Sequence, residues 1–128
     1  MIRFEEMFAG VCPEYRALFK GPLIKSLSRA IAAVNNDMNT MPQAQLQPSS
    51  NCVFAAFREC PWDKLRIVLV GQDPYPNDTA CGLSFSSTGK VPQSVRSILN
   101  VCPGADEILS ANLTPWATRG VLLLNMAL

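Results

Sequence analysis

Apolar residues in the first part of the chain recur at intervals of three and four, which is the spacing of an amphipathic helix. The clearest case follows Gly21, where Pro22 suits the first turn of a helix and an apolar stripe continues to Val34. The same period predicts helices over the ranges 2–8, 13–19, 22–35 and 51–59. A polar segment with two prolines precedes the last of these, and it is predicted to be a loop over 36–50.

Two apolar runs in the second half of the chain have no polar alternation. One spans 65–71 and the other spans 120–125. Such runs are typical of strands that are buried on both faces, as in a parallel sheet covered by helices. A turn-rich loop, a helix at about 93–101 and a further short helix within 106–119 separate the two runs. Strand, helix and strand in this order predict a right-handed βαβ unit within a single α/β domain.

Composition removes several classes of function. The chain has 128 residues, 48% of them apolar and 16% charged, with a net charge of +1. These values exclude a disordered chain and a strongly basic protein that wraps nucleic acid, although they allow a local basic patch. Histidine is absent, which excludes a Ser-His-Asp triad and imidazole ligation of zinc within these residues.

Neither a membrane span nor a secretory signal is visible in the sequence. No apolar run reaches the ~18 residues of a membrane span. The N-terminal segment carries acids early and lacks the apolar core of a signal peptide. An intracellular protein is therefore expected.

The cysteines are odd in number and widely spaced, without a Cys-x-x-Cys pair: Cys12, Cys52, Cys60, Cys81 and Cys102. This spacing argues against a zinc site and against a thioredoxin-like motif. We expect reduced thiols that serve as small apolar side chains, with no metal and no cofactor.

Polar residues follow both predicted strands at the points where the strands end. Gln72 and Asp73 come after the first strand, and Asn125 closes the second. Ligands of open parallel sheets bind at the carboxyl ends of the strands, so an acid and an amide are expected at one crevice. Asp73 could orient a water or stabilise a cation there, or it could cap nearby backbone N–H groups. Asn125 could bind an amide-like edge of a ligand, or simply end the strand.

The connection between the strands carries a second set of candidate residues. Phe85 could stack on a planar base or belong to the core. Ser94 is a predicted N-cap of the following helix, where its hydroxyl and backbone N–H groups could also bind an anion. Lys90 and Arg96 flank this turn and could contact phosphates, although surface cations are more often only solvated.

Several motifs occur in order along the second half of the chain: Val-Gly-Gln-Asp-Pro-Tyr-Pro at 70–76, Gly-Leu-Ser-Phe-Ser at 82–86, Val-Pro-Gln-Ser at 91–94, Trp-Ala at 116–117 and Gly-Val-Leu-Leu-Leu-Asn at 120–125. Together they resemble the family 1 uracil-DNA glycosylases. The resemblance is strong from about residue 40 to 128 and looser before it. It implies an enzyme that hydrolyses the N-glycosidic bond of uracil in DNA and so starts base-excision repair.

The resemblance also implies an architecture. The chain would be part of a three-layer α/β/α domain with a parallel sheet, truncated after the second strand. Residues 1–60 would form its mainly helical N-terminal part. Residues 61–128 would form its first βαβ unit, which carries the water-activating and uracil-binding motifs.

Roles for the residues at the strand ends follow from the same resemblance. Asp73 matches the carboxylate that orients the hydrolytic water and stabilises the cationic sugar as the N-glycosidic bond breaks. Gln72 matches a residue whose backbone helps to bind the base. Asn125 matches the amide that binds the polar edge of uracil, where cytosine would leave a mismatched polar pair.

The remaining matches concern the ring of the base and the DNA backbone. Tyr75 matches the ring that occupies the place of the thymine methyl group, so that thymine is rejected by size. Phe85 matches the residue that stacks on uracil once the base has left the duplex. Pro92 and Ser94 match the proline-rich loop that compresses the DNA backbone. The implied partner is uracil-containing DNA, and a monomer that binds no membrane and no metal is expected.

Two departures from the family pattern bear on activity. Members usually have a histidine after the Pro-Tyr pair, whereas this chain has Pro76, as some poxviral members do. The family also continues into two further parallel strands and a His-Pro-Ser-Pro-Leu-Ser-like segment, which supplies an electrophilic histidine and the wedge that fills the gap left by the flipped base. This sequence contains neither, so an incomplete domain is expected.

Three interpretations therefore stand. The leading one is a uracil-DNA glycosylase of which these 128 residues alone are inactive or very weak. The alternative is a catalytically degraded glycosylase-like module that binds DNA or a protein partner as a replication accessory. An iron–sulfur relative is the third, and the scattered cysteines disfavour it. The expected location is cytoplasmic or nuclear.

Overall fold

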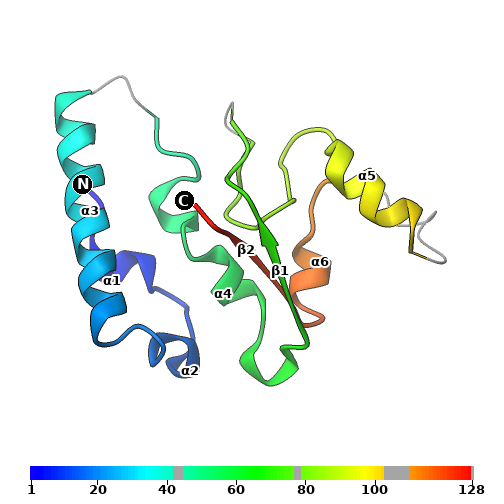
Figure 1. Cartoon of the computed structure of the whole chain (residues 1–128), viewed down its shortest axis with the longest axis horizontal. Coiled ribbons are helices and arrows are strands. Elements are labelled where there is room, and N and C mark those ends of the chain that lie inside the picture. Colours follow the sequence, from blue (N-terminus) through cyan, green and yellow to red (C-terminus); the bar gives the residue numbers. More distant parts are fainter. Residues whose placement is uncertain (42–44, 77–78, 103–109, 128) are drawn as a thin grey trace.

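The structure, a computed structural model, describes residues 1–41, 45–76, 79–102 and 110–127. Three helices lie together at one end of the molecule (Figure 1): α1 (Phe4–Met7), α2 (Pro13–Arg16) and α3 (Pro22–Thr40). The 3₁₀ turns η1 (Ser50–Cys52) and η2 (Trp62–Lys64) flank helix α4 (Ala55–Glu59). The remaining elements are β1 (Ile67–Gly71), α5 (Gln93–Asn100), α6 (Thr114–Ala117) and β2 (Val121–Asn125).

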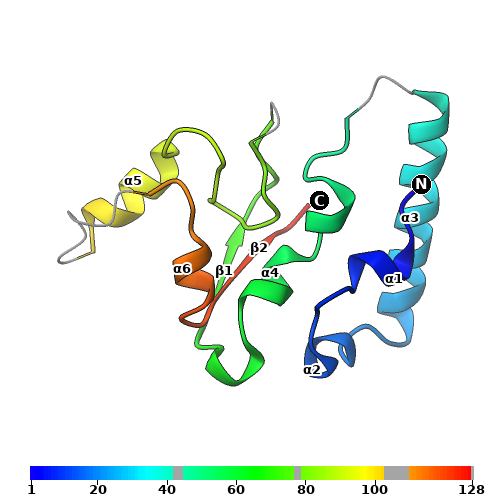
Figure 2. The same cartoon turned by 180° about the vertical axis from the view of Figure 1, so that it is seen from behind.

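The sheet confirms the predicted parallel pairing. β1 and β2 run side by side with Gly71 opposite Asn125, and α5 and α6 lie on the connection between them (Figure 2). The carbonyl oxygen of Gly120 accepts the N–H groups of Arg66 and Ile67, which fixes the start of both strands. α6 is a single turn, shorter than the helix predicted within 106–119. Residues 106–109 of that prediction lie outside the described residues.

The two strands differ in how far they are covered. Leu122 and Leu123 are buried, and neighbouring strand residues point to opposite faces, so both faces of β2 are covered. Helices α4 and α6 both pack against β2. In contrast, Ile67, Val68 and Val70 of β1 are 56%, 53% and 52% exposed. The prediction of a strand buried on both faces is therefore wrong for β1, because the helices that pack closely on the sheet in the described chain, α4 and α6, lie against β2.

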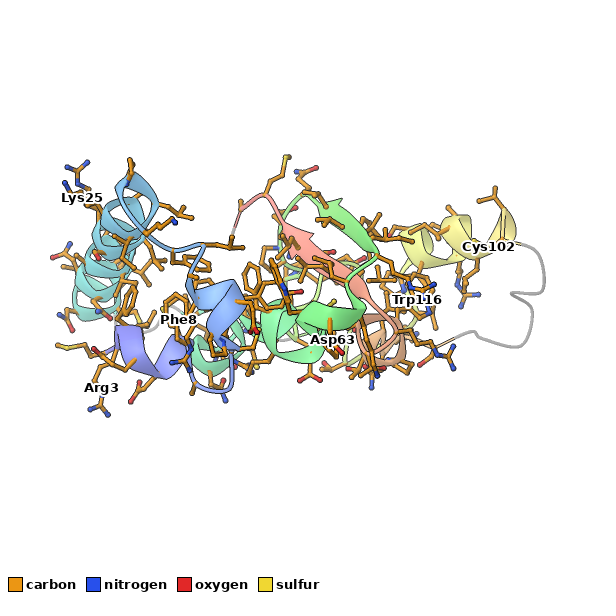
Figure 3. The ribbon with its side chains drawn as sticks, turned by 90° about the horizontal axis from the view of Figure 1, so that it is seen from below. Arg3, Phe8, Lys25, Asp63, Cys102 and Trp116 are labelled. Carbon is orange, nitrogen blue, oxygen red and sulfur yellow. The ribbon has the colours of Figure 1, made fainter. Side chains whose placement is uncertain are left out.

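An aromatic cluster joins the N-terminal helices to the segment that leads into the sheet. The ring of Phe8 lies 4.9 Å from that of Phe19 and 4.8 Å from that of Phe54, with the rings edge to face. Such pairs stabilise a fold by about 0.5–1.5 kcal/mol each beyond the burial of their area. Figure 3 shows Phe8 turned inward, while Arg3 and Lys25 point outward. The helical part thus shares one core with α4.

Helix α3 extends five residues into the segment that is predicted to be a loop. Met38 lies four residues after Val34 and continues the half-buried stripe of the helix. The hydroxyl of Thr40 donates to the carbonyl oxygens of Asn36 and Asp37, which satisfies acceptors in the last turn. The polar composition of the segment hid this continuation. Among the described residues, no helix is both long and apolar enough to cross a membrane.

Tyr15 places its hydroxyl group in the interior, where it has no nitrogen or oxygen partner among the described residues. Burial raises the pKa of Tyr15 far above its usual value, and the neighbouring Cys60 thiol adds to this shift. Because the folded state disfavours the ionised phenol, the contribution of this group to stability is complete below about pH 10 and is lost as the pH rises further.

We expect Tyr15→Phe to leave the free energy of unfolding at pH 7 unchanged, or to raise it by up to ~1 kcal/mol, because it removes a buried polar group without a partner. The variant should also lose less stability than the wild type between pH 7 and about pH 10.5. Urea unfolding at the two pH values measures both effects. An equal alkaline loss in the two proteins would contradict the assignment to Tyr15.

Candidate functional site

The pairing of the two strands continues past their carboxyl ends. Gly71 lies opposite Asn125 in the register. Beyond it, the N–H groups of Met126 and Ala127 donate to the carbonyl oxygens of Gly71 and Gln72 at 3.0 and 3.1 Å. The segments that follow β1 and β2 are therefore held side by side. The carboxyl ends of the two strands lie at the same edge of the sheet, as parallel pairing predicts.

Gly71 marks the point at which two of the predicted base-binding side chains converge. A methyl group added to Gly71 would lie 2.6 Å from Oδ1 of Asn125 and 3.5 Å from Cε2 of Phe85. The amide comes from β2 and the ring from the connecting loop, yet both reach the space above this glycine. An amide beside an aromatic ring is suited to a flat ligand with a polar edge.

The backbone at Phe85 has a φ of 63°, a value that residues other than glycine seldom adopt. Such conformations cost about 1–3 kcal/mol and persist only where the surroundings hold them. Two buried serines supply that support. The N–H of Ser84 donates to the carbonyl oxygen of Leu123 at 3.1 Å, and Oγ of Ser86 accepts the N–H of Leu113 at 3.0 Å. Phe85 itself is half-buried, between the core and the surface.

Asp73 and Gln72 are exposed just beyond the end of β1. The carboxylate of Asp73 forms no hydrogen bond or ion pair with any residue that the structure describes. A capping role would require a hydrogen bond from a nearby backbone N–H group. The described chain therefore does not use Asp73 as a cap, and the carboxylate is open to an external ligand.

Tyr75 and Ser94 meet across nineteen residues of sequence. Their hydroxyl oxygens lie 2.9 Å apart in a part-buried hydrogen bond. The predicted N-cap role of Ser94 is wrong: Pro92 occupies the N-cap position of α5, and no side chain caps this helix. Lys90 and Arg96 lie exposed around the same turn.

The residues that position the site were missed by the sequence analysis. Ser84 and Ser86 anchor the loop of Phe85, and Gly71 leaves the space into which Asn125 reaches. The sequence did hold a signal for them. In an extended segment, alternate side chains point to opposite sides, so the serines on either side of Phe85 are expected to point away from its ring. Their partners, Leu123 and Leu113, are distant in sequence and could not be inferred from it.

A cavity of about 580 Å³ lies elsewhere in the described chain. Arg58, Glu59 and Ser87 are among its walls, and none of the strand-end residues is. Oγ of Ser87 is already engaged, since it accepts the N–H of Gly89 at 3.0 Å. Within the described residues, no three His, Cys, Asp or Glu side chains are grouped so that they could hold a metal ion. All five cysteines are free thiols.

Curated relatives of the chain are named uracil-DNA glycosylase. The protein from Streptococcus mutans is 44% identical over 105 residues, which cover 76% of this chain and 47% of the relative. The protein from Campylobacter fetus is 41% identical over 103 residues, which cover 73% and 43%. The chain belongs to the uracil-DNA glycosylase family. It matches the N-terminal region and spans about half the length of these relatives.

Solved structures agree with this family at the level of the fold. The crystal structure of the mimivirus uracil-DNA glycosylase superposes with a TM-score of 0.67 at 20% sequence identity. The match covers 97% of this chain and 46% of that one. No protein-family model matches the chain. The uracil-DNA glycosylase resemblance and the α/β fold drawn from the motifs are thereby confirmed, with a two-stranded parallel sheet.

Proposed function

We propose that this chain carries the uracil-binding and water-activating part of a uracil-DNA glycosylase, an enzyme that hydrolyses the N-glycosidic bond of uracil in DNA. The observation that carries the proposal is the convergence of Asn125 and Phe85 above Gly71. The ring would stack on the extruded base while the amide pairs with its polar edge. Because an amide offers fixed donors and an acceptor, cytosine would leave a polar pair unmatched and desolvated.

Asp73 would act on the sugar side of the bond. Its carboxylate has no partner in the described chain and lies just past the end of β1, two residues after Gly71. A fixed negative charge at this position stabilises the cation that develops on the sugar, and the same oxygens can orient a water for attack. The backbone of Gln72, whose carbonyl is already bonded to Ala127, would contribute to the base site through its N–H.

Tyr75 and the Pro92–Ser94 turn would complete the recognition of the substrate. The Tyr75 ring would fill the space of the thymine methyl group. Pro92 and Ser94 would contact the DNA backbone at the start of α5, with the exposed Lys90 and Arg96 nearby. The net charge of +1 suits a few local phosphate contacts rather than extensive wrapping.

The partner in this proposal is uracil-containing DNA, bound by a monomer without metal or cofactor in the cytoplasm or the nucleus. We propose further that the 128 residues alone form a single incomplete domain, helical over 1–60 and βαβ over 61–128, and release uracil very slowly. The electrophilic histidine and the wedge segment implied by the family are not in this sequence. Rapid uracil release by the purified chain would contradict this part of the proposal.

A binding module is the second candidate, favoured by one specific observation. Val68 and Val70 leave much of one face of β1 open, which is suited to a protein partner. A degraded glycosylase of this kind would bind DNA or a partner protein and show no preference for uracil.

One comparison of affinities tests the proposal. We expect a single-stranded oligonucleotide with one deoxyuridine to bind about tenfold tighter than the same oligonucleotide with thymidine, measured by fluorescence anisotropy. Gly71→Ala should abolish this preference, because the added methyl group would lie 2.6 Å from Oδ1 of Asn125 and 2.9 Å from Cβ of Ser84, and would displace both the amide and the anchor of the Phe85 loop. Gly89→Ala is the matched control, since its methyl group would make only an ordinary contact with Thr79 at 3.4 Å. Equal affinity of the wild type for both oligonucleotides would favour the binding module.

A further inference from the structure

The hydrogen bond between Tyr75 and Ser94 joins the two parts of the site that are proposed above to recognise different parts of DNA. Tyr75 follows β1 and belongs to the proposed base site, whereas Ser94 lies in the first turn of α5, at the turn proposed to contact the DNA backbone. The two oxygens are 2.9 Å apart and part-buried, which is within the range of an O–H···O bond. No other hydrogen bond of the Tyr75 hydroxyl is seen within the described residues.

We propose that Ser94 is a positioning residue for Tyr75, which sets the Tyr75 ring against the thymine methyl group and couples that position to contact with a DNA phosphate. This inference rests on the proposed glycosylase function. Its first support is geometric: rotation about the Cα–Cβ bond swings the whole phenol ring, and a hydrogen bond at the far end of the ring restricts that swing. The Ser94 hydroxyl holds that end from a separate element, so the ring position depends on α5.

The direction of the hydrogen bond gives the coupling. Each hydroxyl group has one proton to donate, and a phosphodiester can only accept. When Ser94 donates to a phosphate oxygen, its own oxygen is left to accept the proton of Tyr75. The order Tyr75 to Ser94 to phosphate is then fixed, and hydrogen bonds in such a chain strengthen one another. Contact with the DNA backbone would thereby fix the position of the Tyr75 ring while uracil is distinguished from thymine.

Tyrosine signals provide a test that needs no activity. The chain has two tyrosines, Tyr15 and Tyr75, so the NMR signals of ring-labelled tyrosine are assigned with Tyr75→Phe. We expect Ser94→Ala to shift the Tyr75 signals in the free chain. We also expect addition of the thymidine dinucleotide phosphodiester to shift them in the wild type but not in Ser94→Ala. Ser97→Ala is the matched control: its hydroxyl, one turn on, donates to the carbonyl oxygen of Gln93 at 3.1 Å and faces solvent.

Base discrimination provides the second measurement. We expect Ser94→Ala to lower the preference for the deoxyuridine oligonucleotide over the thymidine one by about three- to tenfold, the effect of one hydrogen bond, while Ser97→Ala retains it. If Ser94→Ala weakens both affinities equally and leaves the Tyr75 signals in place, Ser94 is only a backbone contact and the inference is wrong. If the wild type itself shows no preference, the proposed function fails instead, while the Tyr75 signals still report whether Ser94 holds the ring.

Discussion

Gly82→Ala should destabilise the chain by about 3 kcal/mol or more and release the loop that carries Phe85. Gly82 has a φ of +85°, where an L side chain is strained. An added methyl group would also overlap the backbone carbonyl of Cys52 and lie 2.8 Å from Cβ of Ala55. Both neighbours belong to the packed segment of η1 and α4, so neither can yield without displacing the core.

Two matched glycines separate the causes of this effect. Gly21 has a φ of +56° and no atom near an added methyl group, so Gly21→Ala reports backbone strain alone, about 1–2 kcal/mol. Gly89→Ala introduces neither strain nor overlap and should change stability by less than ~0.5 kcal/mol. Urea unfolding of the three variants measures the series. A Gly82→Ala effect no larger than that of Gly21→Ala would show that the close packing of the loop on η1 contributes nothing.

Gly82→Ala should also weaken the preference for uracil, even though the residue touches no ligand. Leu83 is buried directly after Gly82, and the anchored Ser84 follows. The positive φ of Phe85 depends on these anchors, so the ring is held by packing that begins at Gly82. The affinity ratio for deoxyuridine and thymidine oligonucleotides in the variant measures this dependence under conditions where the variant is folded.

The strands and their order could be predicted because hydrophobic patterning is a local property. Each of the two apolar runs is enough to predict a strand, and the polar residues after each run locate the strand ends. The meeting of Gly71 with Asn125 then follows from parallel pairing. The packing of other elements on the faces of a strand is not a local property of its sequence. β1 has an all-apolar sequence on both faces, yet Val68 and Val70 are more than half exposed, because coverage depends on other elements.

The contacts that position the site were beyond prediction for a similar reason. The hydrogen bond between Tyr75 and Ser94 depends on the path of the loop between them. The preference of serine for N-cap positions instead predicted that Ser94 would cap its own helix. The positive φ of Phe85 is a conformation that the residue type disfavours, so local preference argues against it. Family resemblance assigned these residues to the proposed site, and the structure adds the hydrogen bond that joins Tyr75 to Ser94.

Asp73→Asn should reduce uracil release by about 100-fold or more while leaving DNA binding within about twofold of the wild type. Asparagine keeps the shape of the side chain but removes the negative charge that would stabilise the cationic sugar. Since the Asp73 carboxylate has no partner in the described chain, the free energy of unfolding should change by less than ~0.5 kcal/mol. The substitution therefore isolates the charge from the fold.

Asp63→Asn is the matched control, because Asp63 is an exposed carboxylate in η2, away from the carboxyl ends of the strands (Figure 3). Both variants raise the net charge by one, from +1 to +2, so any general electrostatic effect on DNA binding is shared between them. Release is measured with the protein in excess over the oligonucleotide, over incubations long enough to quantify slow release. Loss of release in Asp73→Asn with retained binding assigns the charge to the chemical step, because a group needed only in the transition state lowers the rate without lowering affinity. Equal release by Asp73→Asn and Asp63→Asn would remove Asp73 from the mechanism and leave uracil recognition as the sole role of the strand ends.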